Sequence, residues 1–223
     1  MGNLAEEKGY TYGDYIKWDG NIRYELINGF AYAMASPSQE HQEISGELFR
    51  QLSNFLRGKR CKVFHAAFDV RLNAGSYDDI VVQPDLLVVC DESKLDGQSV
   101  TGAPDFVIEI LSPKNTAHDT ILKFKLYQKA GVREYWIVNP FRRIVEAYIL
   151  RAGKYGGGTI YMGDDIIPVH TLPGCHINLA DVFYGTPEFT EDGDAELKYK
   201  IIESLKKNGL YSEQIEKIIG SYL

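Results

Sequence analysis

The sequence has few cysteines, and their spacing is informative. Its 223 residues include Cys61, Cys90 and Cys175, which lie far apart and form no CxxC pair. This spacing argues against a disulfide framework or a zinc site, and it is compatible with a reducing compartment. We therefore expect a cytoplasmic protein.

Long apolar runs and an excess of basic residues are also missing. No stretch approaches the roughly 18 apolar residues of a membrane span, and the N-terminal sequence MGNLAEEKGYTYGDY lacks the pattern of a signal peptide. We expect neither membrane insertion nor secretion. The net charge of −7 argues against a broad phosphate-binding surface, because such a surface needs clustered Lys and Arg. A nucleic-acid partner would need a local basic patch or a metal ion.

What is present is enough apolar sequence for a large folded domain. Hydrophobic residues make up 44% of the chain and aromatic residues 12%, which suits a globular domain with an appendage. We place one domain at residues 1–184. The remaining residues, 185–223, read as an acidic linker followed by two short amphipathic helices, a C-terminal helical appendage.

The order of predicted elements indicates an α/β (α+β) protein with a mixed sheet flanked by helices. The elements are a short helix starting after Thr11, a hairpin over 22–35 with its turn at Asn28-Gly29, a helix over 39–58, strands within 61–72, 80–89 and 104–111, a helix over 116–130, and a hairpin turning at Asn139-Pro140. Segment 91–103 reads as a polar loop. On the helix over 39–58, the expected buried face carries His41, Ile44, Leu48, Leu52 and Phe55.

Two acidic residues stand inside apolar strands. Asp85 follows Pro84 in VVQPDLLVVC, and Glu109 lies in PDFVIEIL. A buried carboxylate needs a positive or hydrogen-bonding partner. If the two strands pair, these carboxylates lie roughly 5 Å apart on one face and can share a hard cation. Asp105 is roughly 13 Å from Glu109 along its strand, too far to be the second ligand.

A nearby lysine would complete such a site by stabilising developing negative charge or by orienting an attacking water. Lys114 and Lys123 are the candidates, and Lys123 shares a helix face with Tyr127. Other interpretations stay open. Asp85 could cap its strand, Glu109 could pair with an arginine such as Arg71, and Lys123 could belong to an exposed surface ion pair with Asp119.

The segments VVQPDLLVV, FVIEILSP and HDTILKFKLYQKAGVREYWIVNP, together with YELINGF, HQEISGEL and DVRL, resemble the Uma2 restriction endonuclease family, a branch of the PD-(D/E)xK nuclease superfamily. The resemblance runs from about Tyr12 to Phe183. It implies a restriction-endonuclease-like sheet in which Asp85 and Glu109 hold Mg²⁺ or Mn²⁺. The superfamily pattern would place a lysine at position 111, where this chain has Leu111, so the resemblance assigns the lysine role to Lys123. It also makes Glu25 and His41 site neighbours.

These features predict a metal-dependent endonuclease that hydrolyses phosphodiester bonds, with DNA as the favoured nucleic acid. Asp85, Glu109 and Lys123 are the expected catalytic residues, and the carbonyl of Ile110 is a further metal ligand. The alternative is a catalytically silent module with the nuclease fold that serves dimerisation or partner binding. A homodimer fits either function.

Overall fold

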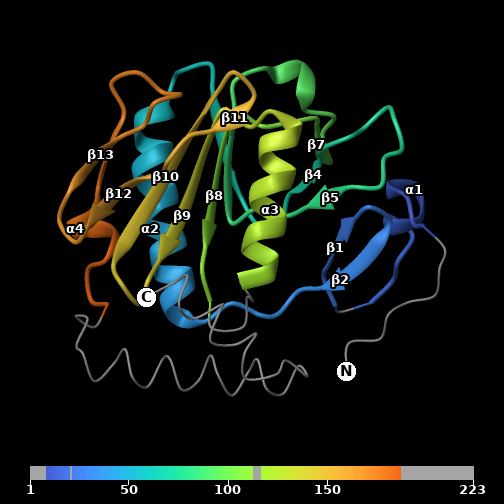
Figure 1. The fold of residues 1–223 in the computed structure, drawn as a ribbon, viewed down its shortest axis with the longest axis horizontal. Helices are drawn as coiled ribbons and strands as arrows, with labels where there is room; N and C mark the ends of the chain where they lie inside the picture. The colour runs from blue at the N-terminus through green and yellow to red at the C-terminus, as the bar shows by residue number, and fades with distance from the viewer. Residues whose placement is uncertain (1–8, 21, 113–116, 187–223) are drawn as a thin grey trace.

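The computed structural model describes residues 9–20, 22–112 and 117–186 (Figure 1). The helices are α1 (Tyr12–Tyr15), α2 (Gln39–Leu56), the 3₁₀ helix η1 (Glu92–Lys94), α3 (Ala117–Ala130) and α4 (Leu179–Val182). The strands are β1 (Tyr24–Ile27), β2 (Phe30–Ala33), β3 (Lys62–His65), β4 (Asp69–Arg71), β5 (Val81–Val82), β6 (Leu86–Val89), β7 (Ser99–Thr101), β8 (Phe106–Ile110), β9 (Glu134–Asn139), β10 (Ile144–Arg151), β11 (Lys154–Tyr155), β12 (Thr159–Met162), β13 (Ile166–Pro168) and β14 (His176–Asn178).

The strands form a large mixed sheet and a smaller second sheet. The large sheet runs β11-β10-β9-β8-β6-β3, with β12 also on β10, and the smaller runs β2-β1-β5-β4-β7. In the large sheet β8 and β9 are parallel, whereas β6 is antiparallel to both β8 and β3. The predicted mixed sheet flanked by helices is thus confirmed. The division of the strands between two sheets was not predicted.

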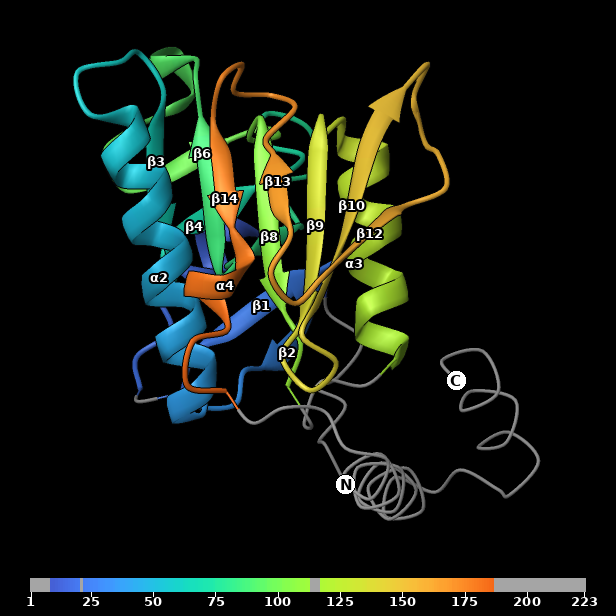
Figure 2. The same cartoon turned by 90° about the vertical axis from the view of Figure 1, so that its left-hand side faces the viewer.

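Alternating residues of the large sheet build two separate cores. One face, which includes Leu86, Ile108 and Trp136, packs against α2, α4 and the β13–β14 pair. The other face, which includes Leu87, Val107 and Tyr135, packs against α3 and the smaller sheet. Figure 2 shows α2 and β14 on one side of the sheet and α3 on the other. The period of two along each strand therefore fixes which layer each side chain meets.

Several predicted elements are confirmed with small shifts. The turn between β1 and β2 has positive φ at Asn28 (51°) and Gly29 (80°), as a type I′ turn requires. In α2 the buried face matches the prediction, except that Leu56 is buried in place of Phe55. Gly131, with φ of 91°, follows the end of α3.

The predicted strands over 61–72 and 80–89 are each broken in two. Each contributes one strand to the large sheet and one to the smaller sheet. Between β5 and β6, Pro84 interrupts the second segment, since proline has no N–H to continue a ladder. Segment 91–103, predicted to be a loop, contains β7, which pairs in parallel with β4. Strand β7 has only three residues, too few for an alternation of apolar and polar residues to be recognised in the sequence.

The argument from cysteine spacing against disulfides was wrong for two of the cysteines. Cys61 and Cys90 form a disulfide with an S–S distance of 2.07 Å. Cys61 immediately precedes β3 and Cys90 immediately follows β6. The two strands are antiparallel, and their register pairs Lys62 with Val89. Antiparallel pairing thus brings together cysteines that are 29 residues apart in the sequence. The cysteine argument for a reducing compartment is lost, and the cytoplasmic location stays a prediction.

Two further predictions concern the ends of the chain and the membrane. Of the predicted linker and C-terminal helices, everything beyond Thr186 lies outside the described residues. Among the helices that the structure describes, none combines the length and apolar character needed to cross a bilayer.

Candidate active site

The candidate site lies where the two sheets and the two long helices approach one another. The antiparallel register pairs Leu86 with Ile108, so the next position places Asp85 beside Glu109. Strand β1 of the smaller sheet supplies Glu25, and α3 supplies Lys123. The predicted pairing of the two acid-bearing strands is confirmed.

Asp85 directly precedes β6, the strand of the large sheet that lies between β8 and β3. Its Oδ2 atom accepts a hydrogen bond of 2.7 Å from the backbone N–H of Ile110. The Nε2 atom of His41 lies 3.1 Å from the same oxygen. Among the described residues no group donates to Oδ1, so one carboxylate oxygen is occupied and the other is available.

Glu109 is buried with its partners on α3. Its Oε1 atom lies 3.0 Å from Lys123 Nζ and accepts a 2.6 Å hydrogen bond from the hydroxyl of Tyr127. Lys123 and Tyr127 are four residues apart and therefore lie on one face of α3. No described donor contacts Glu109 Oε2. The sequence predicts that Tyr127 and Lys123 share a helix face. It does not predict the hydrogen bond from Tyr127 to Glu109, which forms because α3 packs against β8.

Glu25 joins the site from the smaller sheet. Its Oε1 atom lies 2.9 Å from Lys123 Nζ and accepts a 2.9 Å hydrogen bond from the backbone N–H of Gln83. The Gln83 side chain donates in turn to the Tyr15 hydroxyl and to Asp69. Lys123 thus bridges two carboxylates from different sheets. The role of Gln83 was not predicted, since a glutamine before Pro84 carries no periodic or charge signal.

His41 enters from the first turn of α2. Ser38 caps this helix, and its Oγ atom accepts a hydrogen bond from the His41 N–H. The side chain is buried, and no residue that the structure describes hydrogen-bonds to its Nδ1 atom. Burial acts to lower the pKa of His41, whereas the hydrogen bond with Asp85 and the charges of Asp85 and Glu109 raise it, and the net shift is upward.

The charges in the site depend on one another. Burial raises the pKa of Glu109 to about 7, and the Lys123 ammonium opposes this shift. Burial acts to lower the pKa of Lys123, but the charges of Glu109 and Glu25 and the hydrogen bonds to them raise it above the ordinary value. We take Lys123 to be charged, because two carboxylates lie within 3.0 Å of it, and Glu109 to exchange its proton near neutral pH.

The donor set suits a magnesium site that is completed by water and substrate. Within residues 9–20, 22–112 and 117–186, no group of three or more His, Cys, Asp or Glu side chains is arranged to hold a metal ion. Mg²⁺ is commonly bound by only one or two carboxylates together with waters and substrate phosphates. Asp85 Oδ1 and Glu109 Oε2 offer two such oxygens.

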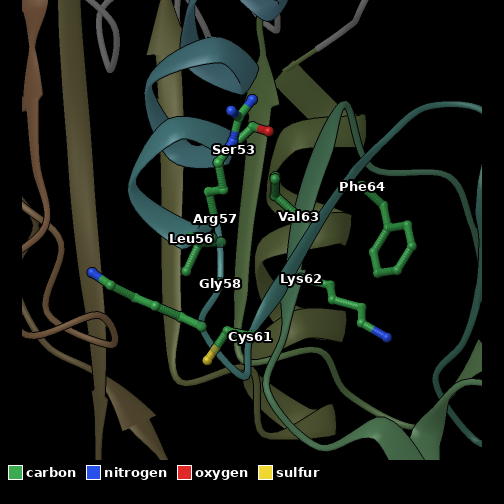
Figure 3. A pocket seen from close by; sticks show the side chains of 9 residues that line it. Ser53, Leu56, Arg57, Gly58, Cys61, Lys62, Val63 and Phe64 are labelled. Atoms are coloured by element: carbon green, nitrogen blue, oxygen red, sulfur yellow. The ribbon is translucent and has the colours of Figure 1, made fainter.

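Two hollows in the described surface lie away from the candidate site. One of about 400 Å³ is at the C-terminal end of α2, the end opposite His41, and is lined by residues such as Arg57 and Lys62. Figure 3 shows the Arg57 and Lys62 side chains pointing in different directions. A second, of about 290 Å³, includes Arg133 and His170. Neither contains a residue of the candidate site.

The structure also decides between interpretations that the sequence left open. Asp105, which the strand spacing had already excluded as a second ligand beside Glu109, binds the Cys90 N–H and Arg133. Arg71 pairs with Asp78 and Asp96 rather than with Glu109. Lys123 is not an exposed surface lysine, since 13% of its side chain is accessible. Lys114 lies outside the described residues.

Comparison with known proteins places this arrangement in a family. The model of the Uma2 family, described as "putative restriction endonuclease", matches residues 12–180. An uncharacterized protein of Synechocystis sp. is 28% identical over 139 residues, which is 60% of this chain and 71% of that protein. A crystal structure of a "putative nuclease belonging to DUF820" from Anabaena variabilis matches with a TM-score of 0.64 and 20% identity, over 78% of this chain and 97% of the other. The fold is therefore shared with that protein, and by the family match the chain belongs to the Uma2 family.

Proposed function

We propose that this protein is a metal-dependent endonuclease that hydrolyses phosphodiester bonds, with DNA as its substrate. Membership of a family described as restriction endonucleases supports nuclease activity. The observation that carries the proposal is the meeting of Asp85, Glu109 and Lys123, which come from three different elements of the fold. Buried titratable groups with displaced pKa values are typical of catalytic sites.

In this proposal Asp85 and Glu109 hold Mg²⁺ or Mn²⁺ through their available oxygens, and the carbonyl of Ile110 is a further ligand. When bound, the cation would neutralise phosphate charge and lower the pKa of a coordinated water. Lys123 stabilises the negative charge that develops on the phosphate. The ion pair with Glu25 holds the Lys123 ammonium group beside Glu109.

Cleavage of supercoiled plasmid DNA tests the proposal. We expect nicking that requires Mg²⁺ or Mn²⁺, and we expect Asp85→Asn and Glu109→Gln each to abolish it while the circular dichroism spectrum stays unchanged. A matched control is Asp164→Asn, an exposed residue in the turn between β12 and β13, which should cut at the wild-type rate. Full activity in either site variant would refute the mechanism.

A catalytically silent module is the second candidate, and one observation favours it. Lys123 is already paired with two carboxylates, as in a purely structural ion cluster. Such a module would bind no divalent cation and would leave DNA intact. Site-specific Mn²⁺ binding that Asp85→Asn removes would count against it. A homodimer stays a prediction in either case, and light scattering of the purified protein measures it.

A further inference from the structure

One side chain of the candidate site has no role in the proposed chemistry. His41 contacts Asp85, yet its nitrogen is a poor ligand for Mg²⁺, which prefers oxygen. The question is what its contact with Asp85 does.

The two contacts of Asp85 fall on a single oxygen. The Ile110 N–H donates to Oδ2 at 2.7 Å, and His41 Nε2 lies 3.1 Å from the same atom. Two donors on one oxygen set both the position and the rotation of the carboxylate. They leave Oδ1 as the oxygen without a described donor, beside the equally available Oε2 of Glu109.

The imidazole is itself fixed in place. His41 is 8% exposed, so its ring has little room to turn. The following turns of α2 are held in the core, because Ile44, Leu48 and Leu52 on the same helix face are fully buried. The first turn is closed by the Ser38 cap.

The surroundings of the two ring nitrogens indicate which of them carries the proton. Nδ1 is buried and has no hydrogen-bond partner within the described part of the chain, whereas Nε2 faces the carboxylate. A contact between Nε2 and a carboxylate oxygen requires a proton on Nε2. Asp85 is therefore the group that sets the orientation of this ring.

We propose that His41 is a positioning residue that, together with the Ile110 N–H, engages Asp85 Oδ2 so that Oδ1 is presented to the divalent cation. This inference rests on the proposed metal-dependent function. Groups that hydrogen-bond a metal-ligating side chain commonly contribute 10- to 100-fold in metal affinity.

Manganese binding by the full-length protein, followed by electron paramagnetic resonance without nucleic acid, tests the inference. His41→Leu removes the donor, whereas the side-chain amide of His41→Gln can keep an N–H near the position of Nε2. We expect Leu to weaken Mn²⁺ binding about 10- to 100-fold and Gln to stay within about threefold of wild type. His176→Leu, at an exposed histidine in β14, is the matched control and should bind as wild type does.

The outcomes separate the inference from the function it depends on. If the wild type binds no Mn²⁺, or if Asp85→Asn does not change its binding, the proposed function fails and the inference fails with it. If the wild type binds and His41→Leu binds equally well, the inference alone is overturned. If Gln is as weak as Leu, the imidazole itself is needed and the positioning role is again overturned.

A spectroscopic measurement covers the case in which His41→Leu does not fold. In ¹⁵N spectra of the imidazole in metal-free protein, we expect His41 to carry a proton on Nε2 and its signal to shift in Asp85→Asn. A ring protonated only on Nδ1, or a signal unaffected by that substitution, would overturn the inference.

Discussion

At the scale of single residues, the site depends on one ammonium group between two buried carboxylates. We expect Lys123→Met to lower the free energy of unfolding by about 3 to 5 kcal/mol, because it leaves Glu25 and Glu109 buried without a cation. Urea denaturation measures the change. The control is Lys125→Met, an exposed lysine on the same helix, which should change stability by less than about 0.5 kcal/mol. An equal effect of the two substitutions would contradict the prediction.

The raised pKa of Glu109 predicts a pH dependence of stability. Between the ordinary carboxyl value of 4.5 and the shifted value of about 7, the folded protein binds more protons at this residue than the unfolded chain does. The resulting stabilisation is complete below about 4.5 and is lost as the pH rises through about 7. Compared with Glu109→Gln, the wild type should therefore lose stability as the pH rises across this window. Melting curves of both proteins from pH 5 to about 8 measure the difference, and parallel pH profiles would disprove the shift.

Much of the site could be predicted from residue type. Asp85 and Glu109 stood out because carboxylates rarely interrupt apolar strands without a partner. The bond from Tyr127 to Glu109 and the support of Glu25 by the Gln83 N–H could not be predicted, since they depend on how α3 and the smaller sheet pack against β8. Local sequence carries no information about that packing.

At the scale of elements, the sequence predicted the regular ones best. The long periodic helix α2 and the Asn28-Gly29 hairpin formed as expected, because a single local rule fixes each of them. The short strands β4, β5 and β7 were missed or merged with their neighbours. Their two or three residues gain their hydrogen bonds from strands distant in the sequence.

The disulfide ties β3 to β6 and carries a prediction at this scale. Cys61 and Cys90 are 29 residues apart, so the bond restricts the unfolded chain by about 3 to 4 kcal/mol on loop-closure grounds. We expect the Cys61→Ser, Cys90→Ser double variant to lose a comparable amount in urea denaturation. Cys175→Ser provides a control that keeps the bond, since Cys175 is the free cysteine. If reduction of the wild type leaves the denaturation midpoint unchanged, the bond does not stabilise the fold.

At the scale of the whole molecule, the candidate site is a product of assembly. The large sheet supplies Glu109, the smaller sheet Glu25, α3 Lys123 and α2 His41. No single layer contains the site. Loss of either sheet or either helix would therefore separate its charges, so that folding and any activity should be lost together on denaturation.

The predicted boundary at residue 184 can be tested at the same scale. If residues 1–184 form the domain, removing residues 187–223 should shift the melting temperature by less than about 3 °C, which corresponds to about 1 kcal/mol. Circular dichroism and Mn²⁺ binding of the shortened protein measure this. A larger loss of stability would mean that the domain includes part of the removed segment.

The covalent link between Cys61 and Cys90 also encloses Asp85 in a closed loop of chain. Tyr77, with 79% of its surface exposed, lies within the same loop. A single cut after Tyr77 would therefore nick this loop without dividing the protein. The cleaved material should migrate as one band on a gel without reductant and as two bands once the sulfurs are reduced.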